Sequence, residues 1–309
     1  MIPTHSFLQR RIRELEDLFF FPVDARIYAV VRIAFALGAT ANLLALWPLA
    51  EPLFSDAGML DEGVARMQAN PFYLSIFAFF TKPAAVHKVF AGTLFALALL
   101  ASGFLARAAA LWVFVWHVSF TSRILIATTG WDMLQSSFSF LVLISPLGHF
   151  SMHSAPEASN GTSSPHTAPA YGLLLLRLQV LVVYWQTVLG RIVTGDAFWK
   201  KGEFLSYFLL SSHSRLPAQW VLDHESLLQL ATYLVQMTEF AIPVLLWVRR
   251  TRWWGITAGV ILHGGICFSA KGLGLFLLTM LMSYTCFLER EDMDRIESAL
   301  TRWTRRRGP

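Results

Sequence analysis

Long apolar runs separated by short polar stretches dominate the pattern along the chain. An α-helix needs roughly 18 or more such residues to cross about 30 Å of hydrocarbon. The runs lack the alternation of apolar and polar positions that marks barrel strands, and backbone groups in lipid must be paired internally, so helices are predicted. The pattern predicts an all-α, polytopic membrane protein with eight spans, at residues 27–50, 85–105, 109–128, 130–146, 171–193, 226–248, 253–269 and 272–288.

Two stretches between the predicted spans do not look like ordinary loops. Residues 51–84 begin polar and become apolar over residues 72–80, a piece too short to cross a membrane, so we expect an interfacial or re-entrant segment. Residues 194–225 mix aromatic and charged side chains, which predicts two short interfacial helices broken at Pro217.

Three further segments complete the predicted domain organisation around a transmembrane domain over residues 27–289. Residues 1–26 interleave arginines with acidic residues and lack the apolar core of a signal peptide, which predicts an amphipathic cytoplasmic helix. Residues 151–170 are rich in Ser, Ala and Pro and lack Lys and Arg, which is typical of a flexible linker. Residues 290–309 form a basic cytoplasmic tail.

The composition excludes an ordinary soluble domain. Hydrophobic residues make up 55% of the 309 and charged residues 15%, with a mean hydropathy of +0.51; soluble domains are about 25% charged. The net charge is +5, but the basic residues cluster at the ends of spans, which indicates a membrane-lipid surface rather than nucleic acid. Cys267 and Cys286 lie in apolar segments without ligand spacing, which argues against a disulfide framework or a structural zinc site.

The placement of Lys and Arg predicts the orientation. With eight spans and the N-terminus inside, the inner side carries the N-terminal arginines, the three arginines near residue 250 and the basic tail. The outer side carries fewer and more dispersed basic residues, so both termini are predicted to be cytoplasmic, in a bacterial inner membrane.

Polar side chains inside the spans are the functional candidates, because charge within hydrocarbon is costly, about 2.5–3.5 kcal/mol for each residue at a span centre. The alternative is that Arg32, Arg123 and Arg177 pair with Asp132 and Glu239 and only hold helices together. The candidates along the spans are Arg32, Asn42, His117, Arg123, Asp132, Gln135, Arg177, Gln179, Tyr184, Gln186, Arg191, Gln236, Glu239 and His263.

Two of these candidates suggest specific chemistry. Arg191 lies near the outer end of its span and, with Lys200 and Lys201, would neutralise an anionic head group or an enolate-like intermediate. His263 is followed by two glycines that leave space beside it, so it is a candidate general base or head-group ligand. No second histidine lies three or four residues away, and no metal site is predicted.

The order of these landmarks resembles the horizontally transferred transmembrane domain family, whose best-known members are the vitamin K-dependent γ-glutamyl carboxylases. Residues 103–150 are similar to the family's Gly-Phe-x-x-Arg turn, polar break with Gly-x-Asp and closing Pro-Leu-Gly. The segment YWQTVLGRIVTGDAFWKKGEFLSYFL is similar to the family's aromatic-rich span with its basic residue and Trp-x-x-Gly. Further likeness lies in LFSDAGML, TEFAIPVLL and LHGGICFSAKGLGLF at residues 53–60, 238–246 and 262–276.

The resemblance implies a chemistry from which this sequence departs. In the carboxylases a lysine at the lumenal end of the aromatic-rich span is thought to deprotonate vitamin K hydroquinone, and the oxygenated product abstracts a proton from a peptide glutamate before CO2 adds. The matching position here is Arg191, which cannot act as that base because arginine keeps its proton. The carboxylases also carry a large lumenal domain, so we expect a closer match to isolated-domain bacterial members, which include a maturation factor for a secreted toxin peptide.

These observations lead to two hypotheses, and whether the protein is an enzyme stays open between them. The first is a membrane enzyme or maturation factor with an outward-facing cavity for a quinone-like, lipid-like or peptide substrate, with a reduced quinone as the cofactor that the resemblance implies. The second is a non-catalytic scaffold or chaperone for a secreted peptide or a partner membrane protein; a transporter ranks third because the two halves show no repeat. The first assigns catalytic roles to Arg191, His263 and Asp132 and substrate binding to Arg123, Tyr184, Trp199 and Lys200.

Overall fold

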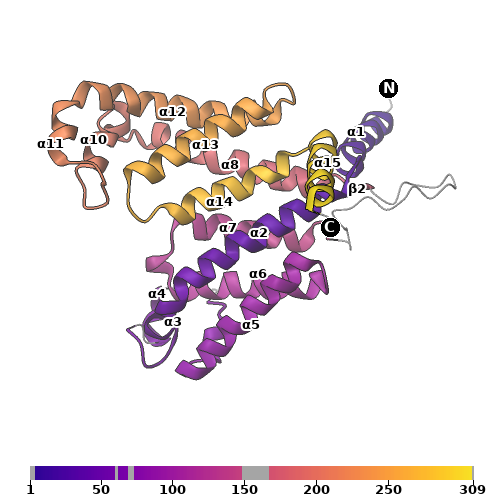
Figure 1. Cartoon of the computed structure of the whole chain (residues 1–309), viewed down its shortest axis with the longest axis horizontal. Helices are drawn as coiled ribbons and strands as arrows, with labels where there is room; N and C mark the ends of the chain where they lie inside the picture. Colours follow the sequence, from indigo (N-terminus) through magenta and orange to yellow (C-terminus); the bar gives the residue numbers. More distant parts are fainter. Residues whose placement is uncertain (1–3, 60–61, 69–72, 148–166, 308–309) are drawn as a thin grey trace. The chain divides into compact units, whose positions relative to one another are not determined.

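The computed structural model describes residues 4–59, 62–68, 73–147 and 167–307, and these are largely helical (Figure 1). The predicted all-α class is confirmed. Two strands of three residues each, β1 (Pro22–Asp24) and β2 (Thr167–Pro169), form an antiparallel pair. The chain divides into two compact units, unit 1 with Met1–Leu176 and Leu288–Pro309, and unit 2 with Arg177–Phe287.

Unit 1 is a helical bundle with an aromatic core. Helix α2 packs against α5 and α7, and α6 packs against both α5 and α7. Phe35, Phe90, Trp116 and Phe120 are completely buried between these helices. The helices of unit 1 are α1 (Thr4–Phe20), α2 (Ala25–Leu46), α3 (Ala50–Phe54), α4 (Glu62–Gln68), α5 (Pro83–Ser102), α6 (Ala106–Arg123), α7 (Gly130–Ile144) and α15 (Arg290–Arg307), with short 3-10 turns η1 (Trp47–Leu49), η2 (Ile76–Ala78) and η3 (Leu125–Ala127).

Unit 2 contains most of α8 (Tyr171–Thr194) and the helices that follow it. Helix α12 packs against α13, and α13 packs against α14. Three short helices lie at the end of the unit where α12 begins, and α10 packs against α12. The helices are α9 (Ala197–Lys200), α10 (Phe204–Leu209), α11 (Ala218–Asp223), α12 (Glu225–Trp247), α13 (Arg252–Ser269) and α14 (Gly274–Tyr284), followed by the 3-10 turn η4 (Thr285–Phe287).

Every predicted span coincides with a helix to within a few residues, but only four of the described helices are long and apolar enough to cross a membrane. These four are the continuous stretch Ala25–Phe54, α5, α8 and α12. Helix α7 has 15 residues and α14 has 11, or about 22 Å and 16 Å at 1.5 Å per residue. Within 18 residues each, α6 carries one histidine and two arginines, and α13 carries one histidine and one arginine. The four long helices support a membrane protein, and the count of eight spans stays a prediction.

The two stretches between spans consist of short helices. In 51–84, α3, α4 and η2 are each too short to cross a membrane. In 194–225 there are three short helices rather than the predicted two, and Pro217 is the N-cap residue of α11, as the predicted break at that position requires. The predicted linker 151–170 lies outside the described residues up to residue 166, and its end forms β2.

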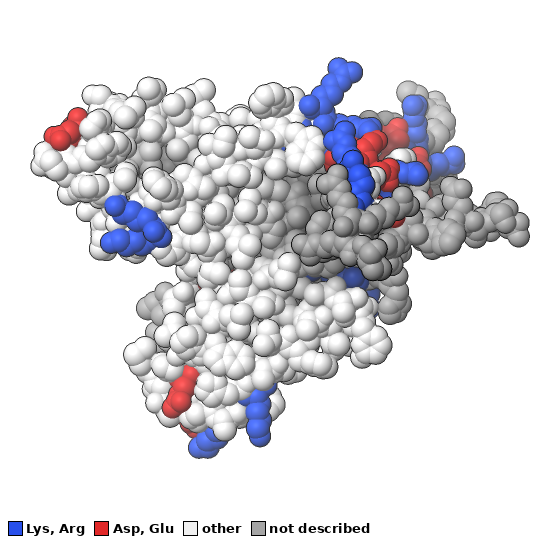
Figure 2. All heavy atoms as spheres, in the orientation of Figure 1, with Lys and Arg blue, Asp and Glu red and all other residues white. Residues whose placement is uncertain are grey.

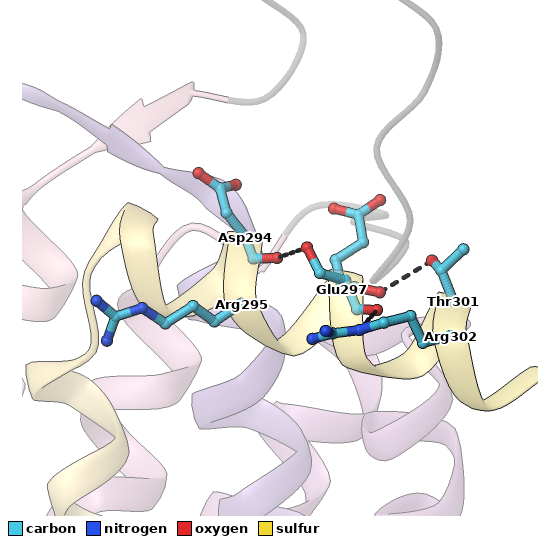
Figure 3. Close-up of a pocket in the computed structure, with 6 residues that line it drawn as sticks. Asp294, Arg295, Glu297, Thr301 and Arg302 are labelled. Atoms are coloured by element: carbon cyan, nitrogen blue, oxygen red, sulfur yellow. Dashed lines mark hydrogen bonds between the residues drawn. The ribbon is translucent and has the colours of Figure 1, made fainter.

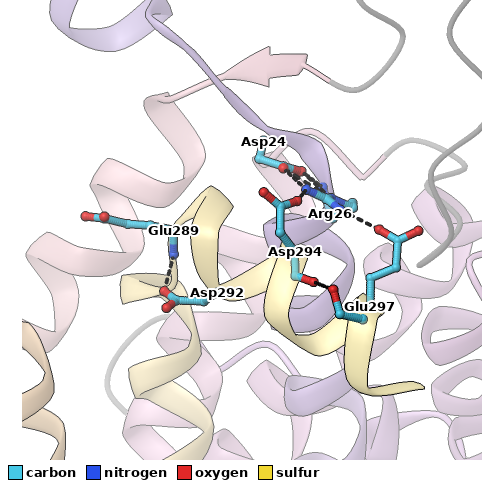
Figure 4. Close-up of polar contacts among 7 residues, drawn as sticks. Asp24, Arg26, Glu289, Asp292, Asp294 and Glu297 are labelled. Atoms are coloured by element: carbon cyan, nitrogen blue, oxygen red, sulfur yellow. Dashed lines mark hydrogen bonds and ion pairs between the residues drawn. The ribbon is translucent and has the colours of Figure 1, made fainter. Parts of the chain in front are cut away.

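A buried arginine joins the beginning of unit 1 to its end. Arg26 donates to Asp24 and Asp294 at 2.6 Å each and to Glu297 at 2.7 Å (Figure 4). Its side chain is 9% exposed and that of Asp24 is 5% exposed. The charged tail predicted after residue 289 is thus the helix α15, held to the start of α2 by one guanidinium.

Charged and apolar side chains occupy different parts of the surface. Side chains of both signs gather over α1 and α15, and few appear along the helices on the face that Figure 2 shows. Large apolar side chains are exposed along the long helices, including Phe95 on α5, Ile192 on α8 and Met237 on α12. Exposed apolar residues on spanning helices are what contact with lipid chains requires.

Candidate functional site

Helix α8 places two candidate residues on one side. Tyr184 and Arg191 are seven residues apart, which is two helical turns, so their side chains leave the helix in similar directions. Tyr184 is 4% exposed, whereas Arg191 is partly exposed. Each meets a polar residue from another helix of unit 2.

Tyr184 is the centre of a buried hydrogen-bonded chain of three side chains. Its hydroxyl lies 2.6 Å from Nε2 of His263 on α13 and also within hydrogen-bond distance of the Tyr284 hydroxyl on α14. Tyr184, His263 and Tyr284 are all at most 4% exposed. Phe276 of α14 packs edge-on against the imidazole, with ring centroids 4.9 Å apart. Three helices therefore enclose this group, which we call the Tyr–His–Tyr chain.

A glycine makes the close approach of Tyr284 possible. A Cβ atom at Gly259, one turn before His263 on α13, would overlap the hydroxyl and ring of Tyr284. The two glycines after His263, in contrast, have open space where a Cβ would be. The sequence predicted space beside His263, and Gly264 and Gly265 do have open space next to them. The glycine that contacts the Tyr–His–Tyr chain is instead Gly259, which precedes the histidine.

The proton count of the Tyr–His–Tyr chain leaves an unsatisfied group at one end. If His263 is protonated on Nδ1, Nε2 accepts from Tyr184 and Tyr184 accepts from Tyr284. If Nε2 carries the proton, every bond in the chain reverses and Tyr284 becomes the final acceptor. In both cases Nδ1 of His263 has no hydrogen-bond partner among the described residues. An unsatisfied buried polar atom is unfavourable by about 1–3 kcal/mol, so a further group is expected at this position.

Arg191 forms the second polar group of unit 2, with one acidic and one aromatic partner. Its Nη1 pairs with Oε2 of Glu239 on α12. Its guanidinium lies over the ring of Trp199, 3.4 Å from the ring centroid. Trp199 also stacks on Phe204, with centroids 4.1 Å apart. We call Arg191, Glu239 and Trp199 the guanidinium group; both charged side chains keep partial contact with the surface, at 17% and 12% exposure.

Local chain geometry holds Trp199 in place. The carboxylate of Asp196 accepts from the backbone N–H groups of Phe198 and Trp199 at 3.0 and 3.3 Å and so caps the short helix α9. The backbone carbonyl of Lys200 accepts from the Tyr233 hydroxyl at 3.0 Å, which fixes α9 to α12. The side chain of Lys200, predicted to bind substrate, is exposed at the end of α9.

Asp132, predicted as a proton acceptor, lies in unit 1 and has structural contacts. It accepts from the backbone N–H and the hydroxyl of Thr129 at 2.9 and 2.6 Å, as part of a capping box that starts α7. Its other oxygen accepts from Asn42 Nδ2 at 2.9 Å. The carboxylate is buried and these three donors surround it, so its contacts are those of a helix cap.

Arg123, predicted to bind substrate, also lies in unit 1. Its Nη1 is 3.1 Å from Oε2 of Glu62 on α4, and the guanidinium side chain is 2% exposed. Tyr73 donates to the same carboxylate at 3.3 Å. Burial, and to a smaller extent the charge of Glu62, raises the pKa of Tyr73, so this phenol keeps its proton at neutral pH.

The pairs predicted for the structural alternative are wrong in their partners. Asp132 pairs with Asn42 and Thr129, not with an arginine, and Glu239 pairs with Arg191. Arg177 donates to the backbone carbonyl of Cys286 at 2.8 Å. The error has a simple reason: residue type and span number do not specify which faces of two helices meet.

The structure thus sorts the seven predicted site residues into two sets. Arg123 and Asp132 belong to unit 1, and each has its own acidic or polar neighbours there. Within unit 2, Tyr184 contacts His263 and Arg191 contacts Trp199. The sequence argument missed Tyr284 and Glu62 as members of these groups, and Tyr284 has no signal in the sequence beyond an aromatic residue near the end of a span.

A hollow in the described surface lies elsewhere, along α15. It is open and of about 790 Å³, lined by Asp294, Arg295, Glu297, Ser298, Thr301 and Arg302 (Figure 3). Thr301 donates to the carbonyl of Glu297 at 2.9 Å and Arg302 to that of Ser298 at 3.2 Å. Thr301 and Arg302 bond to their own helix, and Asp294 and Glu297 pair with Arg26, so the polar groups of the hollow are used in structural contacts and do not converge on a site.

Comparison of the chain with protein-family models, with curated proteins and with solved structures found no match. Among the described residues, no group of three or more His, Cys, Asp or Glu side chains is placed to hold a metal ion.

Proposed function

We propose that this chain is an integral membrane protein that binds the polar head of a quinone-like or lipid-like molecule in unit 2, as an enzyme or maturation factor of the carboxylase-like type that the sequence resembles. The observation that supports this best is the buried Tyr–His–Tyr chain, in which Nδ1 of His263 has no hydrogen-bond partner within the described part of the chain. Helices that only pack together have no need of such a group inside an apolar domain.

The guanidinium group would hold an anionic oxygen of the substrate. Arginine offers several N–H donors in one plane, and only one nitrogen of Arg191 is bound to Glu239 in this structure. Trp199 keeps that plane fixed by stacking beneath it. Because arginine does not release its proton, Arg191 would stabilise charge and not act as the base.

The Tyr–His–Tyr chain would move or accept a proton. His263 is the member whose ordinary pKa is closest to neutrality, and it can receive a proton on Nε2 through the Tyr184 hydroxyl. Its Nδ1, which none of the described residues contacts by a hydrogen bond, is the position to which a hydroxyl or carbonyl of the substrate would bond.

The donor set fits a reduced quinone, since a guanidinium suits an ionised oxygen and an imidazole–phenol chain suits a hydroxyl proton. When bound, a reduced quinone would supply electrons and an ionisable hydroxyl. The residues that would hold its head are Arg191, Trp199, Tyr184 and His263.

The test is mass spectrometry of the protein purified in mild detergent, after extraction of bound small molecules. We expect a quinone or another specific amphiphile in the unaltered protein and a loss of at least tenfold in Arg191→Ala. Lys201→Ala, which removes an exposed charge from the same end of unit 2, is the matched control and should retain the molecule. Bulk phospholipid alone, or equal retention in Arg191→Ala, would contradict the proposal.

A scaffold for a secreted peptide or partner membrane protein is the second candidate, and the ion pairing favours it. Arg26, Arg123 and Arg191 each contact a carboxylate, as charges that only hold helices together would. Removal of one partner of a buried pair is destabilising by about 3–5 kcal/mol, whereas replacement of both by apolar residues is often neutral. A double variant Arg191→Leu/Glu239→Leu that folds and still binds the partner, with no bound quinone in any variant, would establish this second function.

A further inference from the structure

Two glutamines of α8 lie on the side of the helix that faces away from the Tyr–His–Tyr chain. Each residue turns an α-helix by about 100°, so Gln186, two residues after Tyr184, leaves α8 on nearly the opposite side. Gln179 lies seven residues, or two turns, before Gln186 and shares its side of the helix. Gln186 is exposed on unit 2, and Gln179 is half-buried.

The amides of these two glutamines are not used within the part of the chain that the structure describes. No described residue donates a hydrogen bond to either amide or accepts one from it. Thr187, the residue after Gln186, differs in this respect, because its hydroxyl donates to the carbonyl of Val183 at 2.8 Å. Each glutamine therefore keeps two N–H donors and a carbonyl acceptor for a partner.

Their depth in the membrane makes it unfavourable to leave these amides unpaired. Helix α8 has 24 residues and is one of the four helices long and apolar enough to cross. Gln179 and Gln186 lie on either side of its middle, each about 5 Å away along the axis at 1.5 Å per residue. Hydrocarbon extends about 15 Å to each side of the centre of a bilayer, so neither amide reaches the headgroups. Lipid chains offer no hydrogen bond, and we expect the amides to face protein.

The surface around the glutamines suits another helix. Val182 is 47% exposed on the same side of α8. Gly190, one turn after Gln186, has open space where a Cβ would be, so a second backbone can approach closely. Both charged residues of α8, Arg177 and Arg191, leave the helix on the other side, where they bond within unit 2. The exposed side is therefore apolar apart from the two uncharged amides.

We propose that this side of α8, with Gln179, Val182, Gln186 and Gly190, binds the same side of a second copy of the chain; we call it the glutamine face. A twofold axis normal to the membrane keeps both copies in one orientation and brings each residue of the face near its counterpart. A carboxamide both donates and accepts, so Gln186 would bond to Gln186 of the partner subunit. An uncharged face meets itself without repulsion, which favours a second copy as the occupant. The pairing is separate from the guanidinium group and does not depend on the proposed function.

Disulfide cross-linking of the full chain in its membrane tests the proposal. Gln186→Cys is combined with Cys267→Ser, which removes the native cysteine that is partly exposed. After oxidation, we expect a covalent dimer on a non-reducing gel. Ile192→Cys in the same background is the matched control, because Ile192 is 61% exposed on another side of α8. It should give at least fivefold less dimer.

Removal of the amides should weaken the dimer. Gln179→Leu/Gln186→Leu should lower the association constant about tenfold or more, measured by light scattering of the chain purified in mild detergent. Gln186→Asn retains an amide and should keep most of the association. Thr187→Val is the control on the neighbouring position, since that hydroxyl already bonds within α8, and it should dimerise as the unaltered protein does.

Equal dimer yields from Gln186→Cys and Ile192→Cys would overturn the proposal, as would the absence of a dimer from both, which would leave the glutamine face to unit 1 or to lipid. A cross-link from Gln186→Cys to a different protein would assign the face to that partner and overturn it too. Equal association of Gln179→Leu/Gln186→Leu and Thr187→Val would contradict pairing through the amides. If the double variant does not fold, the cross-linking decides, because Gln186→Cys leaves Gln179 in place.

Discussion

The buried polar groups of unit 1 and unit 2 differ in where their partners come from. In unit 1, Asp132 caps its own helix, and Arg26 and Arg123 each pair with carboxylates, while Nε2 of the buried His117 has no hydrogen-bond partner among the described residues. In unit 2, the Tyr–His–Tyr chain draws one residue from each of three helices and still leaves an imidazole nitrogen without a partner among the described residues. The charged groups of unit 1 pair with carboxylates or cap a helix, whereas the Tyr–His–Tyr chain links three helices through side chains that can each donate and accept a hydrogen bond.

The comparison also shows why a list of buried polar residues does not identify a site. Asp132 and His263 both looked like proton acceptors in the sequence, and both are at most 5% exposed. They differ in how many of their hydrogen-bonding positions are used. Four predictions test the distinction, in order of decreasing effect.

The largest effect is expected in unit 1, from Arg26→Ala. It leaves the buried Asp24 without its main partner and releases Asp294 and Glu297, so the free energy of unfolding should fall by about 3–5 kcal/mol. Denaturation in detergent, followed by circular dichroism, measures it. Arg10→Ala is the control, because Arg10 is 82% exposed and its pair with Glu14 is worth only about 0.3–0.5 kcal/mol. An equal loss of unfolding free energy in the two variants would contradict a structural role for Arg26.

The next effect is expected at Gly259. The alanine variant places a Cβ against the Tyr284 hydroxyl, so Tyr284 must move and the free energy of unfolding should fall by about 1–3 kcal/mol. Gly264→Ala, in the same helix with open space at that position, should be neutral or slightly stabilising, since alanine favours helix. If both variants behave alike in thermal denaturation, the Tyr–His–Tyr chain is not packed as described.

A smaller effect is expected from Tyr284→Phe, which removes one hydroxyl and retains the ring. Loss of a buried hydrogen bond should lower the free energy of unfolding by about 1 kcal/mol. The variant also removes one end of the proton chain, so a bound molecule that depends on the chain should be retained less well. Ser283→Ala is the neighbouring control, since that hydroxyl donates only to Met280 of its own helix, at 2.7 Å. If the Tyr–His–Tyr chain is part of a binding site, Tyr284→Phe should retain less of the bound molecule than Ser283→Ala. If the two variants differ only in stability, the chain has a structural role like that of the charged groups in unit 1.

The smallest effect concerns an exposed pair outside the spans. Lys82 lies 3.1 Å from Asp56, and this bond lowers the pKa of the Asp56 carboxyl below its ordinary value. A lowered pKa means that the pair stabilises the fold above the unfolded-state pKa of about 3.9 and that this stabilisation disappears as the pH falls through the folded-state value. The melting temperature of Lys82→Gln should be slightly below that of the unaltered protein at neutral pH and equal to it in strong acid. A difference that grows in acid would have the wrong sign.

The positions of the helices were predictable from the chain alone. Each predicted span matches a helix, and α1 and the break at Pro217 were also expected, whereas α15 was predicted only as a basic tail. The reason is that apolar run length, turn residues and helix breakers act locally, and a membrane requires helices whatever their neighbours. Four long helices are apolar enough to cross a membrane. Helices α6, α7, α13 and α14 are short or carry polar groups and pack against neighbouring helices, and the mean hydropathy of a sequence window does not detect that packing.

The grouping of side chains was decided by tertiary structure. Nothing in the sequence pairs Tyr184 with Tyr284, 100 residues later, or Arg26 with Glu297, 271 residues later. Such pairs depend on which helix faces meet and on small residues such as Gly259 that permit close approach. The sequence by itself determined that polar groups are buried in membrane helices; only packing decided which of them satisfy one another and which are left able to bind something else.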